Sequence, residues 1–287
     1  MDARNYVRLP VVWILVVTGS VSLAAGSEAG LKTEELFPRI EAVSFESVNL
    51  KKTKRAVIVL PEEWRSIKPA DRRVLVILHG RGRHERSLVD DEVIRRQLLD
   101  SGLFVILPDG DDGWYINSPL RKLDVYETYL EEVLAKVANK YDLPENGKQW
   151  AIAGWSMGGF GCINFAERHP GRVAAVSSII GLLDFPRNGL PEGQSYKVPV
   201  ERFGSDEAVW DRFNPLNGVD KLQGMSVLII TADQAFDRTM NEHFRDRLTA
   251  LEIPHQYVEL KGGHTFPVVR AAIPLVLSHT QRVQTRN

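Results

Sequence analysis

The fold is decided by the stretch Gly154-Trp155-Ser156-Met157-Gly158-Gly159. It follows an apolar run at residues 150–153 and precedes a helical pattern at residues 160–168. A serine between glycines at a strand-to-helix turn is typical of a nucleophile elbow, a tight turn that exposes the serine hydroxyl at the carboxyl end of a sheet. We therefore expect Ser156 to be a catalytic nucleophile rather than part of a turn that only packs a helix on a strand.

A serine hydroxyl needs a base, which is normally a histidine that a carboxylate orients. In folds with this elbow, the acid and then the histidine follow the serine along the chain. His264 lies in a glycine-containing loop after a predicted strand at residues 255–260, where an imidazole can reach Ser156. The sequence thus predicts His264 as the base.

The acid is expected after the preceding predicted strand, at residues 226–231. Asp233 comes immediately past that strand and is the predicted acid. Asp237 is the alternative, although it also fits the N-cap of a helix beginning at Arg238, where a carboxylate accepts helix N–H groups.

Acyl transfer places negative charge on the carbonyl oxygen, so backbone N–H groups must face that oxygen. The N–H of Met157, directly after the serine, is one expected donor. The second is expected from the N–H of Arg81, in a loop that follows the predicted strand at residues 74–78. Gly80 and Gly82 in this loop allow the backbone to approach a substrate closely.

Four side chains are candidates for substrate binding. Trp114 and Tyr115 follow a predicted strand at residues 103–107, at the sheet end where ligands bind in such folds. They either stack on a substrate ring or only form the wall of their loop. Arg83 either recognises an anionic group or belongs to a solvated loop surface. Trp155, the residue before the nucleophile, is the fourth candidate.

Composition narrows the function classes. The 287 residues are 44% hydrophobic and 25% charged, with net charge −1, which are average values for a globular protein. The absence of a basic excess argues against nucleic acid as the partner. Cys162 is the single cysteine, so neither an intramolecular disulfide nor a cysteine-based metal site can form. We expect a small-molecule substrate and no bound metal.

Apolar strand-like runs alternate with amphipathic helical patterns along residues 44–287, which predicts one α/β domain. The clearest helices are expected at residues 125–140, 238–251 and 268–277. The first strands have no helix between them, so the sheet is expected to open with an antiparallel pair and then become parallel.

The N-terminal residues 1–26 form a separate piece. Arg4 and Arg8 precede an apolar run at residues 9–17, and small residues end the stretch, which is the pattern of a secretory signal peptide. The alternative, an uncleaved anchor, needs about 20 apolar residues to cross a bilayer. We therefore predict cleavage, export to a periplasm or the exterior, and no stable membrane span afterwards. A loose leader is expected at residues 27–43.

Several further motifs occur in order over residues 45–272. They are His79-Gly80, Pro108-Asp109-Gly110, Gly113-Trp114-Tyr115, Tyr126-Glu127-Thr128-Tyr129, His169-Pro170, Phe213-Asn214-Pro215 and Gly262-Gly263-His264. Together with the elbow, this set resembles the putative-esterase family of α/β-hydrolases. That family includes S-formylglutathione hydrolase (esterase D), feruloyl esterase, tributyrin esterase and mycolyltransferase types.

The resemblance implies an α/β-hydrolase fold with a mostly parallel central sheet and hydrolysis of carboxylic esters without a cofactor. It also implies a triad of Ser156, Asp233 and His264. Ile230 stands where the family usually has a glycine, three residues before the aspartate, so the choice between Asp233 and Asp237 stays open. An acyltransferase, or a catalytically retired binding protein on the same fold, is the alternative function.

Overall fold

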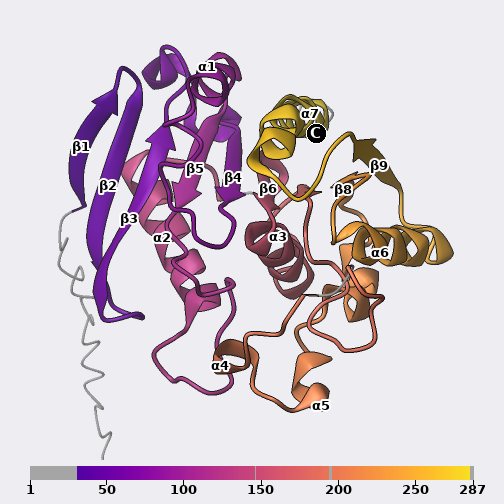
Figure 1. Cartoon of the computed structure of the whole chain (residues 1–287). Coiled ribbons are helices and arrows are strands. Elements are labelled where there is room, and N and C mark those ends of the chain that lie inside the picture. Colours follow the sequence, from indigo (N-terminus) through magenta and orange to yellow (C-terminus); the bar gives the residue numbers. More distant parts are fainter. Residues whose placement is uncertain (1–30, 146, 194–195, 285–287) are drawn as a thin grey trace, which may run out of the picture.

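The computed structural model describes residues 31–145, 147–193 and 196–284 (Figure 1). The expected signal peptide at residues 1–26 lies outside these ranges, and export stays a prediction. In the described part of the chain, no helix combines the length and the apolar character that crossing a bilayer requires.

Within the described residues, nine strands form a single sheet. They are β1 (Lys32–Phe37), β2 (Ile40–Ser47), β3 (Lys52–Val59), β4 (Val74–Leu78), β5 (Phe104–Pro108), β6 (Trp150–Trp155), β7 (Ala175–Ile179), β8 (Ser226–Ala232) and β9 (His255–Leu260). The helices are α1 (Glu92–Asp100), α2 (Tyr126–Lys140), α3 (Met157–Arg168), α4 (Val200–Phe203), α5 (Glu207–Trp210), α6 (Arg238–Ala250) and α7 (Phe266–Gln284).

The strand order is β1-β2-β3-β5-β4-β6-β7-β8-β9. The pairs β1–β2, β2–β3 and β3–β5 are antiparallel, and every later pair is parallel. The expected change from an antiparallel start to a parallel sheet is therefore confirmed. Because the parallel strands share one direction, the loops that leave their carboxyl ends meet along one edge of the sheet.

Helices cover both faces of the sheet, as the continuous apolar strands indicated. In β4, Val74 and Val76 face the core under α2, α3 and α6, whereas Leu75 and Ile77 face the core under α1 and α7. Figure 1 shows α1 and α7 above the central strands and α2 and α3 below them. The two layers hold β4 and β6 rigidly, and these strands carry the loops that build the site.

The prediction of a loose leader at residues 27–43 is wrong where the structure describes it. β1 and the start of β2 lie within this span and pair antiparallel, from Lys32 opposite Ser44 to Phe37 opposite Ile40, with one shift of register between Glu35 and Phe37. β1 is mostly exposed, so it has little hydrophobic pattern to reveal it in the sequence. Its order comes from ladder hydrogen bonds to β2 rather than from burial.

Candidate active site

The turn around Ser156 has the geometry of a nucleophile elbow. Ser156 lies between β6 and α3 with φ 56° and ψ −119°, a backbone conformation that few non-glycine residues adopt. A Cβ on Gly154 would lie 2.1 Å from the Gly158 carbonyl oxygen, and one on Gly158 would lie 2.1 Å from the Leu78 carbonyl oxygen. Both glycines are therefore required for the turn, and the strain at Ser156 is held by the packing of strand against helix.

His264 contacts Ser156 as the sequence predicted. Its Nε2 lies 2.8 Å from the Ser156 Oγ. The histidine comes from the loop between β9 and α7, and Figure 1 shows this loop passing close to the start of α3. The hydroxyl and the imidazole, 108 residues apart in sequence, are thus brought into hydrogen-bonding distance.

The carboxylate on the other side of the histidine belongs to Asp237. Its Oδ1 lies 2.6 Å from the His264 Nδ1, and its side chain is fully buried. Asp237 also accepts a hydrogen bond from the Asn241 Nδ2 at 2.9 Å and one from the Thr231 hydroxyl at 3.4 Å. These donors satisfy the carboxylate and fix the direction in which it meets the imidazole.

The prediction that Asp233 orients His264 is therefore wrong. The Asp233 carboxylate instead accepts hydrogen bonds from the Lys261 Nζ at 2.8 Å and from the Gly262 N–H at 2.9 Å. The Lys261 ammonium and this N–H lower the pKa of the Asp233 carboxyl. Asp233 continues the pairing of β8 with β9, so its side chain stays at the sheet edge, and the chain must turn before an aspartate faces the histidine.

Asp237 occupies the N-cap position of α6 that the sequence predicted, but its side chain makes no capping hydrogen bond to the helix backbone. The carboxylate faces His264 instead. The departure at Ile230 from the family pattern was the one sequence signal that pointed away from Asp233.

A small pocket opens over the serine and the histidine. It has a volume of about 170 Å³. Its walls come from the carboxyl ends of β4, β6, β7 and β9, from the segments that follow them, and from the start of α7. It is lined by Gly80, Arg81, Arg83, Trp155, Ser156, Ile180, His264, Thr265, Phe266 and Val269. The candidates Arg83 and Trp155 thus lie beside the reactive groups.

Trp114 and Tyr115 do not line this pocket, and their prediction as substrate contacts finds no support in the geometry. Both are buried, and both have φ 55°, which turns the chain back toward the interior. The Trp114 ring packs against Phe160 and Phe185 with centroids 5.4 and 5.1 Å apart. The Tyr115 hydroxyl accepts the His79 N–H at 3.0 Å.

The two predicted oxyanion donors border the serine. Met157 is the first residue of α3, where an N–H has no acceptor within the helix. Gly80 lies against the elbow, because a Cβ there would be 3.3 Å from the Ser156 Cβ and 2.7 Å from the Trp155 Nε1. Arg81, the residue that follows Gly80, lines the same pocket as Ser156.

The two arginines of this loop differ in their partners. The Arg81 Nε lies 3.0 Å from the Asp112 Oδ2, and its guanidinium donates to the Tyr196 hydroxyl at 3.0 Å. The Arg83 guanidinium lies over the Phe266 ring, 5.1 Å from its centroid. No carboxylate of the described residues forms an ion pair with Arg83, so its charge is available at the pocket.

Cys162 lies inside α3 and is fully buried, and burial raises the pKa of its thiol far above the usual range. A thiol held neutral in the core is not a competing nucleophile.

Comparison with known proteins gives a consistent picture. A sequence model of the family described as Putative esterase matches residues 47–274. A Mycobacterium tuberculosis protein named an esterase is 27% identical over 242 residues, which cover 73% of this chain and 52% of that protein. The chain thus spans about half the length of this relative. An acetyl esterase from Caldicellulosiruptor saccharolyticus is 21% identical over 189 residues, covering 63% of this chain and 70% of that protein.

Solved structures agree in fold. The fluorophosphonate-binding serine hydrolase F of Staphylococcus aureus superposes with a TM-score of 0.72 at 23% identity, covering 84% of this chain and 97% of that one. A ferulic acid esterase also gives a TM-score of 0.72, at 20% identity, covering 89% of this chain and all of that one. The predicted α/β-hydrolase fold is therefore confirmed.

Proposed function

Because the chain belongs to the putative esterase family, we propose that it hydrolyses carboxylic esters with Ser156 as the nucleophile. The observation that carries this proposal is the line of contacts from the Ser156 hydroxyl through His264 to the buried carboxylate of Asp237. A hydroxyl, an imidazole and a carboxylate in this order are what nucleophilic acyl transfer requires.

In the proposed mechanism, the His264 Nε2 takes the proton of the Ser156 hydroxyl as the oxygen attacks the ester carbonyl. Asp237 holds the Nδ1–H and stabilises the imidazolium that forms. The N–H groups of Met157 and Arg81 bind the oxyanion of the tetrahedral intermediate. The imidazolium then protonates the departing alcohol, leaving an acyl group on Ser156. Water, deprotonated by the His264 imidazole, releases the acid by the same steps.

The pocket favours a short acyl group. A volume of about 170 Å³ lies below the roughly 300–1,000 Å³ of pockets that enclose drug-sized ligands. We propose that acetyl and butyryl esters are accepted better than octanoyl esters. Arg83 adds a preference for substrates with an anionic group, because its charge has no carboxylate partner in the described part of the chain and it stands beside Ser156 in the pocket wall.

The experiment is hydrolysis of p-nitrophenyl acetate, butyrate and octanoate by the mature protein and by Ser156→Ala. Ser66→Ala serves as a matched control, because that serine is exposed and lies in a short 3₁₀ helix after β3. We expect activity to fall by on the order of 10⁴ or more in Ser156→Ala and to stay unchanged in the control. Equal activity of Ser156→Ala and the parent protein contradicts the proposal.

The proposal extends to export. The pattern of residues 1–26 supports it, and fractionation of cells that express the whole chain tests it. An N-terminus that begins near residue 27 in the secreted or periplasmic fraction is the expected result. Retention of Met1 on a cytosolic protein contradicts export but leaves the proposed chemistry standing.

A further inference from the structure

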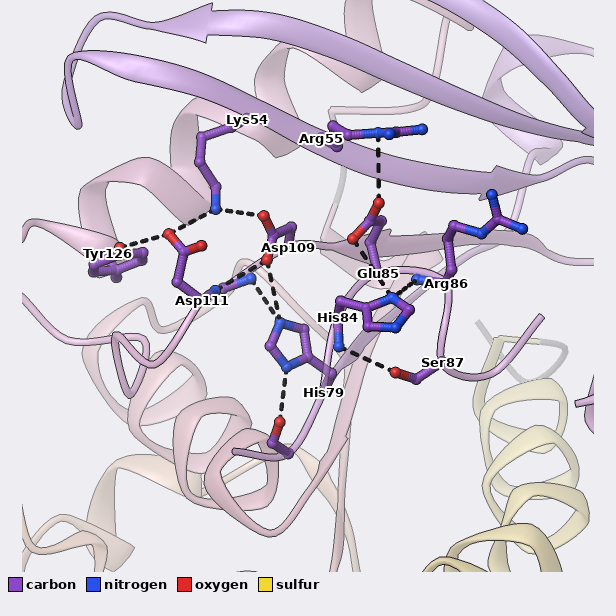
Figure 2. Close-up of polar contacts among 12 residues, drawn as sticks. Lys54, Arg55, His79, His84, Glu85, Arg86, Ser87, Asp109, Asp111 and Tyr126 are labelled. Atoms are coloured by element: carbon purple, nitrogen blue, oxygen red, sulfur yellow. Dashed lines mark hydrogen bonds and ion pairs between the residues drawn. The ribbon is translucent and has the colours of Figure 1, made fainter. Parts of the chain in front are cut away.

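A buried charged cluster lies outside the proposed catalytic residues. Lys54 on β3 has only 1% of its side chain exposed, although lysine is rarely buried (Figure 2). Its Nζ lies 2.6 Å from the Asp109 Oδ2 and 2.8 Å from the Asp111 Oδ2. Apolar residues commonly fill such a space at equal or lower cost, so stability alone does not account for this ammonium.

The two aspartates that hold Lys54 belong to one tight turn after β5. The Asp109 Oδ1 accepts the Asp111 N–H at 3.1 Å, which closes the turn around Gly110. A side chain on Gly110 would meet the Tyr115 ring at 2.4 Å, so the backbone is fixed from that side too. Lys54 thus ties this turn to strand β3, in the rigid part of the sheet.

The Asp109–Asp111 turn also holds His79, the first residue after β4. The Gly110 N–H donates to the His79 Nε2 at 2.8 Å, so this nitrogen carries no proton. The neutral imidazole therefore has its proton on Nδ1, which donates to the Gly80 carbonyl oxygen at 2.9 Å. His79 is 2% exposed, and Figure 2 shows its ring facing the turn that contains Asp109 and Asp111.

The Gly80 carbonyl decides where the next N–H points. In a planar trans peptide, the carbonyl of one residue and the N–H of the next point in opposite directions. The Gly80 oxygen is held by the His79 Nδ1–H and by the Arg83 N–H at 3.1 Å. The Arg81 N–H is consequently turned away from the His79 ring, and Arg81 itself lines the pocket that contains Ser156.

We propose that His79 is a positioning residue that aims the Arg81 N–H at the oxyanion, and that Lys54 keeps His79 in place through the Asp109–Asp111 turn. The inference rests on the proposed function, which makes this N–H an oxyanion donor. His79 touches no reacting atom in this arrangement. It acts through one peptide plane, and Lys54 acts through the turn.

Two substitutions of His79 separate its two hydrogen bonds. In His79→Asn the amide hangs from Cγ, as Nδ1 does, and can still donate to the Gly80 carbonyl. In His79→Gln the amide lies one bond farther out, where it replaces Nε2 and accepts from the Gly110 N–H. Lys54→Met removes the buried ammonium at similar length. Lys52→Met is its matched control, because Lys52 also binds Asp111 but is 46% exposed.

The measurements are kcat and KM for p-nitrophenyl acetate, and Ki for a trifluoromethyl ketone whose hemiketal oxygen occupies the oxyanion position. Loss of an oxyanion donor costs about 10²–10³ in kcat. We therefore expect His79→Gln, which loses the hydrogen bond to the Gly80 carbonyl, to lower kcat on the order of 10²-fold and to raise Ki by the same factor, with KM within about threefold. Lys54→Met and His79→Asn both weaken the link between the turn and residue 79 but keep a donor to the Gly80 carbonyl, so they lose less, roughly tenfold, whereas Lys52→Met stays within about threefold.

Thermal unfolding of each variant, with assays well below the midpoint, separates misfolding from misplacement of the N–H. If Lys54→Met does not fold, the two His79 variants still decide. Equal kcat and Ki in His79→Asn and His79→Gln overturn the inference, as does a loss in KM alone. If Ser156→Ala keeps the parent activity, the proposed function itself fails. If Ser156→Ala is inactive but His79→Asn and His79→Gln have equal kcat and Ki, the esterase proposal stands and this inference is wrong.

Discussion

Helix α6 contributes to two histidine–aspartate pairs that look alike in isolation. Asp237 at its start lies 2.6 Å from the His264 Nδ1. His243, one and a half turns along, has its Nδ1 2.7 Å from the Asp184 Oδ2. Both carboxylates are buried, with 0% and 1% of the side chain exposed.

The two pairs differ in what surrounds them. The second ring nitrogen of His264 meets the Ser156 hydroxyl, and a pocket opens beside it. Asp184 is shared with the Arg187 guanidinium at 2.7 Å and the Asn214 amide at 3.0 Å, which tie the segment after β7 to the rest of the domain. An oriented histidine is therefore not a site by itself. The elbow that presents a hydroxyl makes the first pair useful for chemistry.

The largest expected effect tests the first pair. Asp237→Asn removes the charge that orients and stabilises the His264 imidazolium, and the amide N–H can favour the wrong tautomer. We expect kcat to fall by about 10⁴ with little change in KM, because the loss is felt in the transition state. Steady-state hydrolysis of p-nitrophenyl acetate measures it. A fall of less than tenfold contradicts the role of Asp237.

The same change in the second pair is expected to affect stability instead. Asp184→Asn leaves His243 and Arg187 without their buried carboxylate, which costs about 2 kcal/mol in the free energy of unfolding. Urea denaturation measures this, with exposed Asp211→Asn as the control. Below the unfolding transition kcat should stay within about threefold of the parent value, since no reacting group is touched. A large loss of kcat in Asp184→Asn would contradict this distinction, because it would give the His243–Asp184 pair a role in catalysis.

A third histidine, His279, has no carboxylate partner among the described residues, and it is expected to make the stability of the protein depend on pH. His279 in α7 contacts the Ser177 hydroxyl through Nδ1 at 2.9 Å and the Ser226 hydroxyl through Nε2 at 2.8 Å. It is buried and does not line the pocket that contains Ser156. Burial, and secondarily the charge of Arg282, lowers the pKa of His279 to about 4. The unfolded chain therefore binds this proton more readily than the folded one.

Stability from this group is present above the unfolded pKa of about 6.5 and is lost as the pH falls toward 4. Between pH 7 and pH 5 the loss amounts to about 2 kcal/mol. Urea denaturation at both pH values should show a smaller loss in His279→Gln than in the parent protein. An identical pH dependence in the two proteins means that His279 is not held neutral by the fold.

The smallest effect on kcat and stability is expected at Asp233, the aspartate that does not contact His264. Asp233→Asn keeps an oxygen for the Gly262 N–H and loses only the pair with Lys261, whose side chain is 94% exposed. Exposed ion pairs contribute little to stability because water and salt screen them, so both stability and kcat should stay near the parent values. Assays beside Asp237→Asn provide the direct contrast. A kcat loss as large as that of Asp237→Asn restores Asp233 as the acid.

Ser156 and His264 could be placed from the sequence because their positions follow from local rules. A serine with Gly154 two residues before it and Gly158 two residues after it, placed after an apolar strand, is expected to adopt the tight strand-to-helix turn of a nucleophile elbow. A histidine in the loop after a late parallel strand lies at the same edge of the sheet as this serine. The parallel order of the sheet follows from the alternation of strands and helices. These features depend on a few neighbouring residues.

The acid could not be chosen in this way. Asp233 and Asp237 flank the same short turn, and which of them faces His264 depends on how that turn folds against β9 and α7. Trp114 and Tyr115 show the same limit, since two left-handed residues send their rings inward where a regular loop would leave them at the surface. Tertiary packing decides both cases.

The most direct test of the central claim is the mass of the protein after brief mixing with p-nitrophenyl acetate and quenching in acid, followed by mapping of the modified peptide. The account predicts one acetyl group on Ser156. It should form at the parent rate in Asp233→Asn, on the order of 10³-fold or more slowly in Asp237→Asn, and not at all in Ser156→Ala. Acetyl on another residue, or equal rates in the two aspartate variants, contradicts a nucleophile at Ser156 that His264 and Asp237 activate.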